Sequence, residues 1–171
     1  RNYCGIDFPD NLKKNQKLLE TVITPTTKDI EDIPISKLDI IKKKYLTKEE
    51  CDYIYEKSIE LFEFGQELAD KAGLILVDTK YEFGKDNNGK IILIDELHTC
   101  DSSRYWIKES YNNRFENNLE PEKIDKDSIR DFVKQQCNPY TEKIPEIPNF
   151  LKDKTIKSYT DFYKKISKII K

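Results

Sequence analysis

The strongest constraint on the fold of this chain is a predicted β-hairpin with strands 74–84 and 90–97. Each strand contains a run of apolar residues that favour β-structure, and the pair Asn88-Gly89 lies between the two runs. Asn-Gly is typical of a tight hairpin because a type I′ turn needs positive φ at both central residues. The sequence therefore predicts an antiparallel sheet built around this hairpin.

Several ionisable side chains lie on these strands. With the Asn-Gly pair at the centre of the turn, Glu82 faces Asp95, and the two-residue period of a strand adds Asp78 and Lys80 to the same face. Facing residues lie roughly 4.5–5.5 Å apart at Cβ, so the two carboxylates repel each other unless a cation lies between them. Mg²⁺ binds one or two protein carboxylates together with phosphate oxygens, and a lysine suits a phosphate. The pattern therefore predicts a site for Mg²⁺ and phosphate.

Two other interpretations of this hairpin remain open from the residues alone. A register slip of one residue would place Glu96, not Asp95, on the face that carries Glu82. Alternatively, the charges decorate a solvent-exposed face, which is common in a chain with 36% charged residues. The register therefore decides whether the geometric argument for a metal site holds.

Three sequence runs on and after the hairpin resemble one enzyme family. The runs "LVDTKYEFG", "ILIDEL" and "DSSRYW" are similar to those of SAICAR synthetases, the phosphoribosylaminoimidazole-succinocarboxamide synthases of purine synthesis. The similarity continues in three further groups of residues: Gly5 with Pro9–Leu12 and Gln16–Leu18, Thr24–Lys28 (TPTTK) with Asp32 and Ile35-Ser36, and Asp125–Asp127 with Arg130-Asp131. The matches therefore run from about residue 3 to the C-terminal helix.

The resemblance implies a fold and a reaction. The fold would be α+β and SAICAR synthase-like (related to the ATP-grasp fold), with an antiparallel sheet flanked by helices. The reaction would join the carboxylate of carboxyaminoimidazole ribonucleotide (CAIR) to the amine of L-aspartate through an acyl phosphate, and would convert ATP to ADP and phosphate. The implied small-molecule partners are CAIR, L-aspartate and ATP, with Mg²⁺ as the metal. Such chemistry depends mainly on positioning and on neutralising the transferring phosphoryl oxygens.

The resemblance also implies roles for individual residues. Glu82 and Asp95 would bind the metal and the ATP phosphates. Lys80, Asp101 and Arg104 would be catalytic, and Lys80 and Arg104 would also bind the nucleotide, for which arginine offers a bidentate grip. The remaining substrate contacts would come from Ser103, Lys28, Asp32, Lys126 and Arg130, of which the last two lie four residues apart and so share a helix face.

The chain departs from the family pattern in three ways. Cys100 stands where the family usually has Pro, and Glu31 stands where it often has His. The family's N-terminal lobe, with its phosphate loop and adenine pocket, has no counterpart here, and the chain begins with Arg1 and contains no Met. We therefore expect a C-terminal part of the enzyme, for which the missing N-terminal lobe of the same protein would be a partner.

We expect this part to be a single domain with three regions. Residues 1–46 form a loop-rich lead-in with the TPTTK segment, in which 35–44 are interpreted as a strand or turn. Residues 47–137 form the catalytic core with the 74–97 hairpin, and residues 138–171 form a linker with three prolines followed by an amphipathic helix.

One long helix is predicted within the core. Thr47 and Glu50 form a capping box that opens it, and Gly73 is typical of its end. An apolar stripe runs between these signals, so we expect the helix to cover one face of the sheet. Gly65 within it would allow a close approach to the hairpin strands.

Composition narrows the classes of function. The net charge of −2 suggests neither a nucleic-acid nor a membrane partner, no run is long and apolar enough to span a bilayer, and we expect a cytoplasmic protein. The four cysteines lack paired spacing, which disfavours a zinc site and a disulfide framework. His98, the single histidine, is interpreted as structural or solvated rather than catalytic.

Two alternatives to the ligase remain. A carboxylate–metal–phosphate hairpin would also suit a phosphotransferase of the same fold, similar to some inositol phosphate kinases. A chain without the N-terminal lobe could instead be a non-catalytic remnant that binds substrate. The TPTTK segment and the loop from Asp101 to Arg104 favour the ligase.

Overall fold

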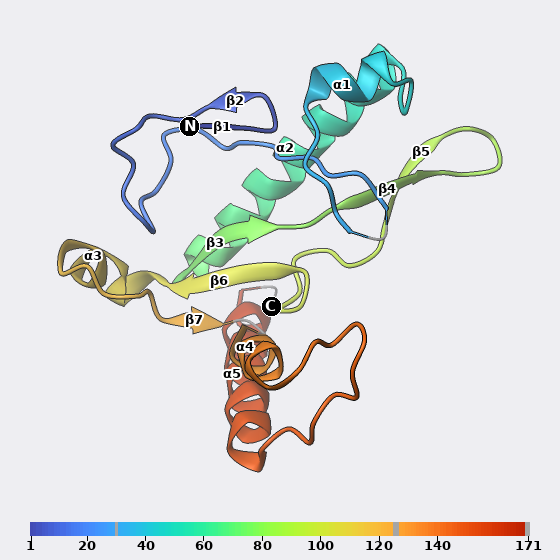
Figure 1. The fold of residues 1–171 in the computed structure, drawn as a ribbon. Coiled ribbons are helices and arrows are strands. Elements are labelled where there is room, and N and C mark those ends of the chain that lie inside the picture. Colours follow the sequence, from blue (N-terminus) through green and yellow to red (C-terminus); the bar gives the residue numbers. More distant parts are fainter. Residues whose placement is uncertain (30, 125–126, 170–171) are drawn as a thin grey trace. The chain divides into compact units, whose positions relative to one another are not determined.

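A computed structural model describes residues 1–29, 31–124 and 127–169 of the protein. Its helices and strands form two compact units (Figure 1). The first unit comprises Arg1–Glu63 and Glu82–Ile94, and the second comprises Phe64–Tyr81 and Asp95–Lys171. The strands pair antiparallel and occur together with helices, which confirms the predicted α+β class. Each unit is described by itself below.

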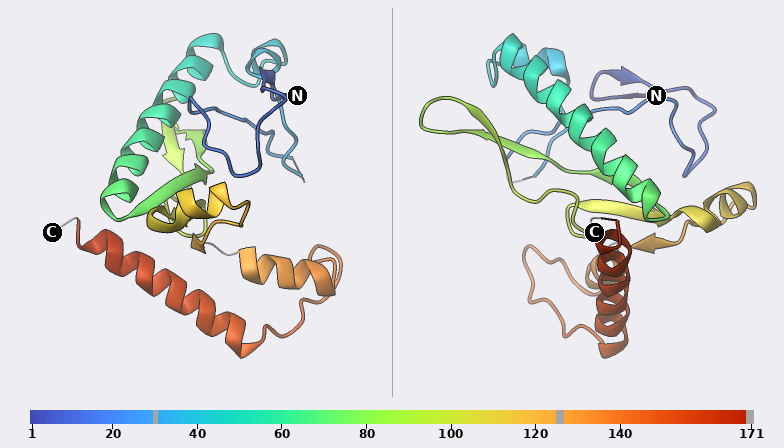
Figure 2. Two further views of the ribbon diagram at one scale, coloured as in Figure 1. Left: turned by 90° about the vertical axis from the view of Figure 1, so that its left-hand side faces the viewer. Right: turned by 180° about the vertical axis from the view of Figure 1, so that it is seen from behind.

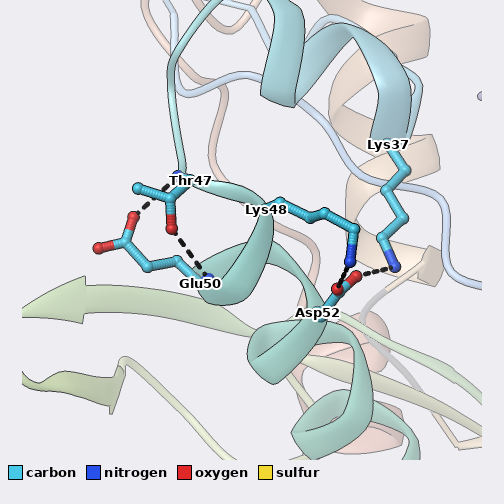
Figure 3. Close-up of polar contacts among 5 residues, drawn as sticks. All are labelled: Lys37, Thr47, Lys48, Glu50 and Asp52. Atoms are coloured by element: carbon cyan, nitrogen blue, oxygen red, sulfur yellow. Dashed lines mark hydrogen bonds and ion pairs between the residues drawn. The ribbon is translucent and has the colours of Figure 1, made fainter.

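The predicted capping box opens the long helix α2 (Lys48–Lys71). The Thr47 hydroxyl accepts a hydrogen bond from the Glu50 N–H at 3.2 Å, and the Glu50 carboxylate accepts one from the Thr47 N–H at 3.0 Å (Figure 3). Each bond satisfies a backbone donor that a helix N-terminus otherwise leaves free. The helix is followed, as predicted, by Gly73, whose φ of +71° suits the left-handed residue after a helix.

A second helix in the first unit was not predicted. Residues 37–42 form α1 (Lys37–Lys42), capped by the Ser36 hydroxyl, so the prediction of a strand or turn here was wrong. Six helical residues are too few to show a helical period in the sequence. Lys37 and Lys48 each lie 2.7 Å from the Asp52 carboxylate and hold its pKa down at about 2, with Lys37 the larger cause (Figure 3).

A small apolar cluster joins α1 to the start of α2. Ile35, Ile40 and Cys51 are buried there, and Ile41, Leu46 and Tyr55 pack against them. The N-terminus contributes a short hairpin that was also not predicted, formed by β1 (Asn2–Tyr3) and β2 (Ile6–Asp7). Its turn residues Cys4 and Gly5 both have positive φ.

The predicted hairpin exists, but its register differs from the prediction. Strand β4 (Glu82–Lys85) pairs with β5 (Ile91–Ile94), and Glu82 lies opposite Ile94, so the predicted pairing of Glu82 with Asp95 was wrong. The cause is the turn: the Asp86 carboxylate accepts hydrogen bonds from two backbone N–H groups, those of Asn88 at 2.9 Å and Lys90 at 2.8 Å. These bonds favour a three-residue loop over the two-residue type I′ turn and shift the pairing by one residue.

The second unit is built on a three-stranded antiparallel sheet. Strand β3 (Leu74–Thr79) pairs with β6 (Ser103–Ile107), and β6 pairs with β7 (Lys123–Ile124) (Figure 1). The predicted continuous strand 74–84 is therefore divided between β3 and β4, which have different partners. A β-bulge at Val77 also shifts the register of β3 against β6 by one residue. The apolar–polar pattern of a sequence does not reveal such an insertion.

Three helices complete the second unit: α3 (Lys108–Glu116), α4 (Asp127–Gln136) and α5 (Asn149–Ser167). Helix α5 packs against α4 and β7 (Figure 2), and its Phe162 ring lies 4.6 Å from the ring of Tyr105 in β6. The proline-containing connection and the terminal helix agree with the prediction. Within the described ranges, no helix has the length and apolar character needed to cross a membrane.

Candidate functional site

In the first unit, the TPTTK segment forms one side of a narrow loop. The N–H of Thr27 donates to the carbonyl of Ile33 at 2.9 Å, and the N–H of Ile35 donates to the carbonyl of Pro25 at 3.0 Å. Both predicted substrate residues of this segment lie in the part of the loop that these two bonds enclose. The backbone of the loop is thus closed at its base.

An ion pair joins this loop to the β4–β5 hairpin. The Lys28 ammonium contacts the Glu82 carboxylate, and the lysine side chain is 77% exposed while that of the glutamate is only 16% exposed. A carboxylate removed from water needs a compensating cation. An exposed lysine can move away when another cation arrives, so Glu82 is suited to exchange Lys28 for a metal. Asp32 is exposed on the same loop.

Two buried polar atoms in the described residues have no hydrogen-bond partner, namely Thr27 Oγ1 and Trp106 Nε1. Thr27 directly precedes Lys28 in the TPTTK segment. A buried hydroxyl without a partner costs about 1–3 kcal/mol, so such groups are uncommon in native proteins. No sequence signal distinguishes this threonine from its exposed neighbour Thr26, so its buried hydroxyl was not predicted.

Asp95 directly follows β5 and is exposed. Its φ of +74° lies in the left-handed region, which aspartate tolerates better than most residues. Because Glu82 faces Ile94 instead, the register gives no support for a shared metal site. The roles of Glu82 and Asp95 as metal carboxylates therefore rest on the family resemblance.

The donor chemistry fits Mg²⁺ bound with a nucleotide better than a metal held by protein alone. Among the described residues, no group of three or more His, Cys, Asp or Glu side chains could hold a metal ion. Mg²⁺ needs only one or two protein carboxylates when water and phosphate oxygens fill the rest of its shell. A partly buried carboxylate such as that of Glu82 suits this mode of binding.

In the second unit, Thr99 organises the loop that leads into β6. Its hydroxyl accepts hydrogen bonds from the N–H groups of Asp101 at 3.2 Å and Ser102 at 3.1 Å, and its carbonyl accepts one from the N–H of Ser103 at 3.0 Å. In return, the Thr99 N–H donates to the Ser102 hydroxyl at 3.2 Å. The loop resembles a capped helical turn, and its backbone donors are largely satisfied locally.

The predicted substrate residues of this unit lie at the start of β6. Arg104 faces Asp78 across the β3–β6 pair, and its guanidinium donates to the Asp78 carboxylate at 2.6 Å. Both side chains are partly exposed, so solvent reaches the ion pair. Ser103 is buried, and its hydroxyl lies 2.8 Å from that of Thr79.

Lys80 and Asp101 have exposed side chains, and the backbone fixes the position of Lys80. Its N–H donates to the carbonyl of Ser102 at 3.0 Å. The backbone of Lys80 is therefore hydrogen-bonded to the loop that contains Asp101 and leads to Arg104. Arg130 is exposed on α4, whereas Lys126 lies outside the described residues.

His98 is packed more closely than the sequence indicated. Its ring contacts the Tyr81 hydroxyl through Nε2, and its carbonyl accepts a hydrogen bond from the Tyr105 hydroxyl at 2.7 Å. Gly65 of α2 lies so near that an added Cβ would stand 2.4 Å from ring atom Cε1. Gly65 was expected to admit the hairpin strands, but in the second unit it admits this ring. Burial lowers the pKa of His98 and raises that of Tyr81, so the imidazole is neutral and the phenol protonated at neutral pH.

Comparison with known proteins identifies the family. The sequence model of SAICAR synthetase matches residues 3–147. The chain belongs to the SAICAR synthetase family. A phosphoribosylaminoimidazole-succinocarboxamide synthase named as chloroplastic, from Vigna aconitifolia, is 53% identical over 153 residues, which are 88% of this chain and 45% of that protein.

Solved structures support the same assignment. The chain superimposes on SAICAR synthase from Saccharomyces cerevisiae in complex with SAICAR with a TM-score of 0.73 and 27% identity, over 95% of this chain and 52% of the yeast chain. It superimposes on a type-2 SAICAR synthetase in complex with ADP with a TM-score of 0.65 and 25% identity, over 91% and 54% of the two chains. The predicted SAICAR synthase-like fold is thus confirmed. The chain spans about half the length of the curated relatives that it matches.

Proposed function

We propose that this chain forms the substrate-binding part of an ATP-dependent ligase that joins CAIR to L-aspartate and produces SAICAR, ADP and phosphate. The observation that carries the proposal is the family match over residues 3–147, which includes both loops described above. The molecules bound to solved relatives agree with it, since one relative holds SAICAR and another holds ADP, both of which are products of this reaction. The missing N-terminal lobe of the same protein would supply the rest of the nucleotide site.

In this proposal the second unit binds the imidazole nucleotide. Arg104, whose guanidinium donates a hydrogen bond to Asp78, would bind a carboxylate or phosphate of the substrate. Because Asp78 holds the guanidinium in place, little side-chain entropy is lost on binding. Lys80 adds a positive charge, and Asp101, at the exposed edge of the loop, accepts a proton or a hydrogen bond from the amine of L-aspartate. Ser103 contributes by fixing the start of β6.

In the first unit, Glu82 would hold Mg²⁺ with the ATP phosphates, and Asp95 is retained as a proposed metal and ATP-phosphate carboxylate on the basis of the family resemblance. Mg²⁺ supplies charge neutralisation at the phosphoryl oxygens when it is bound. Lys28, released from Glu82, would then be free to pair with a phosphate or with a substrate carboxylate. Asp32, Lys126 and Arg130 are retained as proposed substrate contacts. The cytoplasmic location stays a prediction, because plant relatives are named as chloroplastic.

The test is release of ADP from the full-length protein, measured with CAIR and L-aspartate supplied together and then singly. We expect turnover only when both substrates, ATP and Mg²⁺ are present. ADP release with an inositol phosphate, and none with CAIR and L-aspartate, would support the phosphotransferase instead. A folded full-length protein that turns over neither substrate would support the non-catalytic alternative.

A further inference from the structure

The His98 ring occupies a position that the proposed reaction does not explain. Three features of the second unit converge on it: a glycine in α2, a tyrosine hydroxyl and a left-handed backbone. Gly65 leaves space for the ring, since a Cβ would lie 2.4–2.8 Å from its Cε1, Nδ1 and Nε2 atoms. Distances under about 3 Å are incompatible with van der Waals contact, so no residue other than glycine fits there while the ring stays in place.

Gly65 lowers the stability of the helix that contains it. A glycine within a helix destabilises it by roughly 1 kcal/mol relative to alanine, and Gly65 lies in the interior of α2 (Lys48–Lys71). His98 adds a second cost, because its φ of +54° is uncommon for a residue with a side chain. Both costs fall on the same contact, which indicates that the position of the ring is important to the protein.

The ring is joined to the substrate loop through its own backbone. The carbonyl of His98 accepts a hydrogen bond from the hydroxyl of Tyr105, which is only 2% exposed, and the next residue is Thr99. The Thr99 hydroxyl accepts hydrogen bonds from the N–H groups of Asp101 and Ser102, and its carbonyl accepts one from the N–H of Ser103. A rotation of the His98 backbone would therefore move the whole turn that precedes Arg104.

The hydrogen bond to Tyr81 fixes the orientation of the His98 ring. Burial keeps the imidazole neutral and the phenol protonated, and the Tyr81 hydroxyl is hydrogen-bonded to Nε2, with the tautomer of the ring deciding which of the two groups donates. The tilted rings, with centroids 5.6 Å apart, also pack against each other. A ring flipped by 180° would move Nε2 away from the Tyr81 hydroxyl and lose this bond.

We propose that His98, fixed by Gly65 and Tyr81, is a positioning residue that sets the conformation of the Thr99–Arg104 loop for binding the anionic imidazole nucleotide. The part that concerns this substrate rests on the proposed function. His98 touches no reacting atom in this proposal. It acts through Thr99 on the direction of Arg104, and its loss affects binding of one substrate rather than all of them.

Kinetics of the full-length protein test the proposal with two variants. In His98→Asn the side chain still tolerates the left-handed backbone but lacks the ring, and in Gly65→Ala the added methyl displaces the ring. Both should raise KM for CAIR about tenfold, which corresponds to the loss of one well-made hydrogen bond, while KM for ATP and kcat change by less than about threefold. Equal increases in KM for all three substrates, or no increase for CAIR, would overturn the proposal.

A double variant separates the ring from the helix. In a His98→Ala background the clash is absent, so Gly65→Ala should leave KM for CAIR within about twofold of the His98→Ala value and should raise the melting temperature through its higher helix propensity. If Gly65→Ala were as damaging in this background as in the wild type, the contact between Gly65 and His98 would not be its cause.

A second readout does not depend on activity. Tyr81→Phe removes the hydrogen-bond partner of Nε2, and we expect the ¹⁵N signal of Nε2 in the His98 ring to shift while hydrogen exchange at the Ser102 and Ser103 amides becomes faster. Tyr163→Phe is the matched control, because Tyr163 is 71% exposed. Unchanged exchange in Tyr81→Phe would overturn the positioning role. A wild-type protein without ligase activity would instead overturn the proposed function and leave this exchange result interpretable.

Discussion

The two loops with proposed substrate residues are held in different ways. The Thr99–Arg104 loop of the second unit is fixed by several hydrogen bonds from Thr99 and by buried residues such as Tyr105. The TPTTK loop of the first unit is closed at its base, but its Lys28 is exposed and pairs with Glu82, and among the described residues the Thr27 hydroxyl is buried without a hydrogen-bond partner. The Thr99–Arg104 loop is thus preorganised. The TPTTK loop instead has polar groups whose best partners would arrive with the ligand.

Preorganisation and exchange serve different ligands. When the guanidinium that binds a nucleotide is already fixed, little side-chain entropy is lost on binding, which favours selectivity for one substrate. A metal with ATP phosphates brings its own charges, so a site that receives it needs a carboxylate whose counterion can leave. The comparison predicts that substitutions in the fixed loop affect one substrate strongly, and that substitutions in the TPTTK loop mainly affect Mg²⁺-dependent binding.

The largest effect is expected for Arg104→Ala. Hydrogen bonds to charged groups contribute about 1.5–3 kcal/mol, so kcat/KM for CAIR should fall roughly 10- to 100-fold while the affinity for Mg-ATP stays within about threefold. Arg114→Ala is the matched control, because Arg114 has a similar exposed fraction and pairs with Glu122 in the same unit. A loss in Arg114→Ala as large as that in Arg104→Ala would show that the grip assigned to Arg104 is wrong.

An intermediate effect is expected for Glu82→Gln. The amide keeps the shape of the side chain but cannot neutralise a metal, so we expect the Mg²⁺-dependent affinity for ATP to fall about tenfold, as measured by calorimetry over a range of Mg²⁺ concentrations. Glu67→Gln, which breaks an exposed pair with Lys71, should leave this affinity unchanged. If ATP binding in Glu82→Gln retained its full dependence on Mg²⁺, Glu82 would not be a metal carboxylate.

A smaller effect with the opposite sign is expected for Thr27→Val. The change replaces a buried hydroxyl that has no partner with a methyl group of similar size, so the free energy of unfolding should rise by about 1 kcal/mol in urea denaturation. Thr26→Val, at an exposed neighbouring position, provides the control and should change it by less than about 0.5 kcal/mol. A destabilised Thr27→Val would mean that the hydroxyl has a partner in the native protein and that the two loops differ less than we propose.

Sequence signals with a local cause were confirmed. The capping box of Thr47 and Glu50 and the terminating Gly73 depend on residues within one helix turn, so they mark α2 with little influence from the rest of the chain. The connection with three prolines and the terminal helix were predicted for the same reason. The family resemblance supplied the candidate substrate residues, which local pattern alone could not assign.

Predictions that depended on which strands and residues pair with each other were less accurate. The hairpin was found, but one carboxylate, that of Asp86, selected a longer turn and shifted Glu82 from Asp95 to Ile94. The partner of β3 was missed because strand order is set by contacts between residues far apart in sequence. The packing of Gly65 against His98 was missed for the same reason, since neither residue alone indicates which group fills the space.

The smallest expected effect is a pH dependence of the free energy of unfolding, which tests whether the His98 ring beside the fixed loop is held in its neutral form. Burial lowers the pKa of His98 below its ordinary value of 6.5 in the folded protein. The unfolded chain therefore binds the proton first as the pH falls, so the contribution of the neutral ring to the free energy of unfolding is complete above about pH 6.5 and is lost as the pH drops toward the lower folded pKa. His98→Asn has no such proton to bind. Urea denaturation at pH 7.5 and pH 5 should show that the free energy of unfolding falls more in the wild type than in His98→Asn over this interval. Identical losses in the two proteins would indicate that His98 titrates normally and that its ring is not held in the neutral form beside Tyr81.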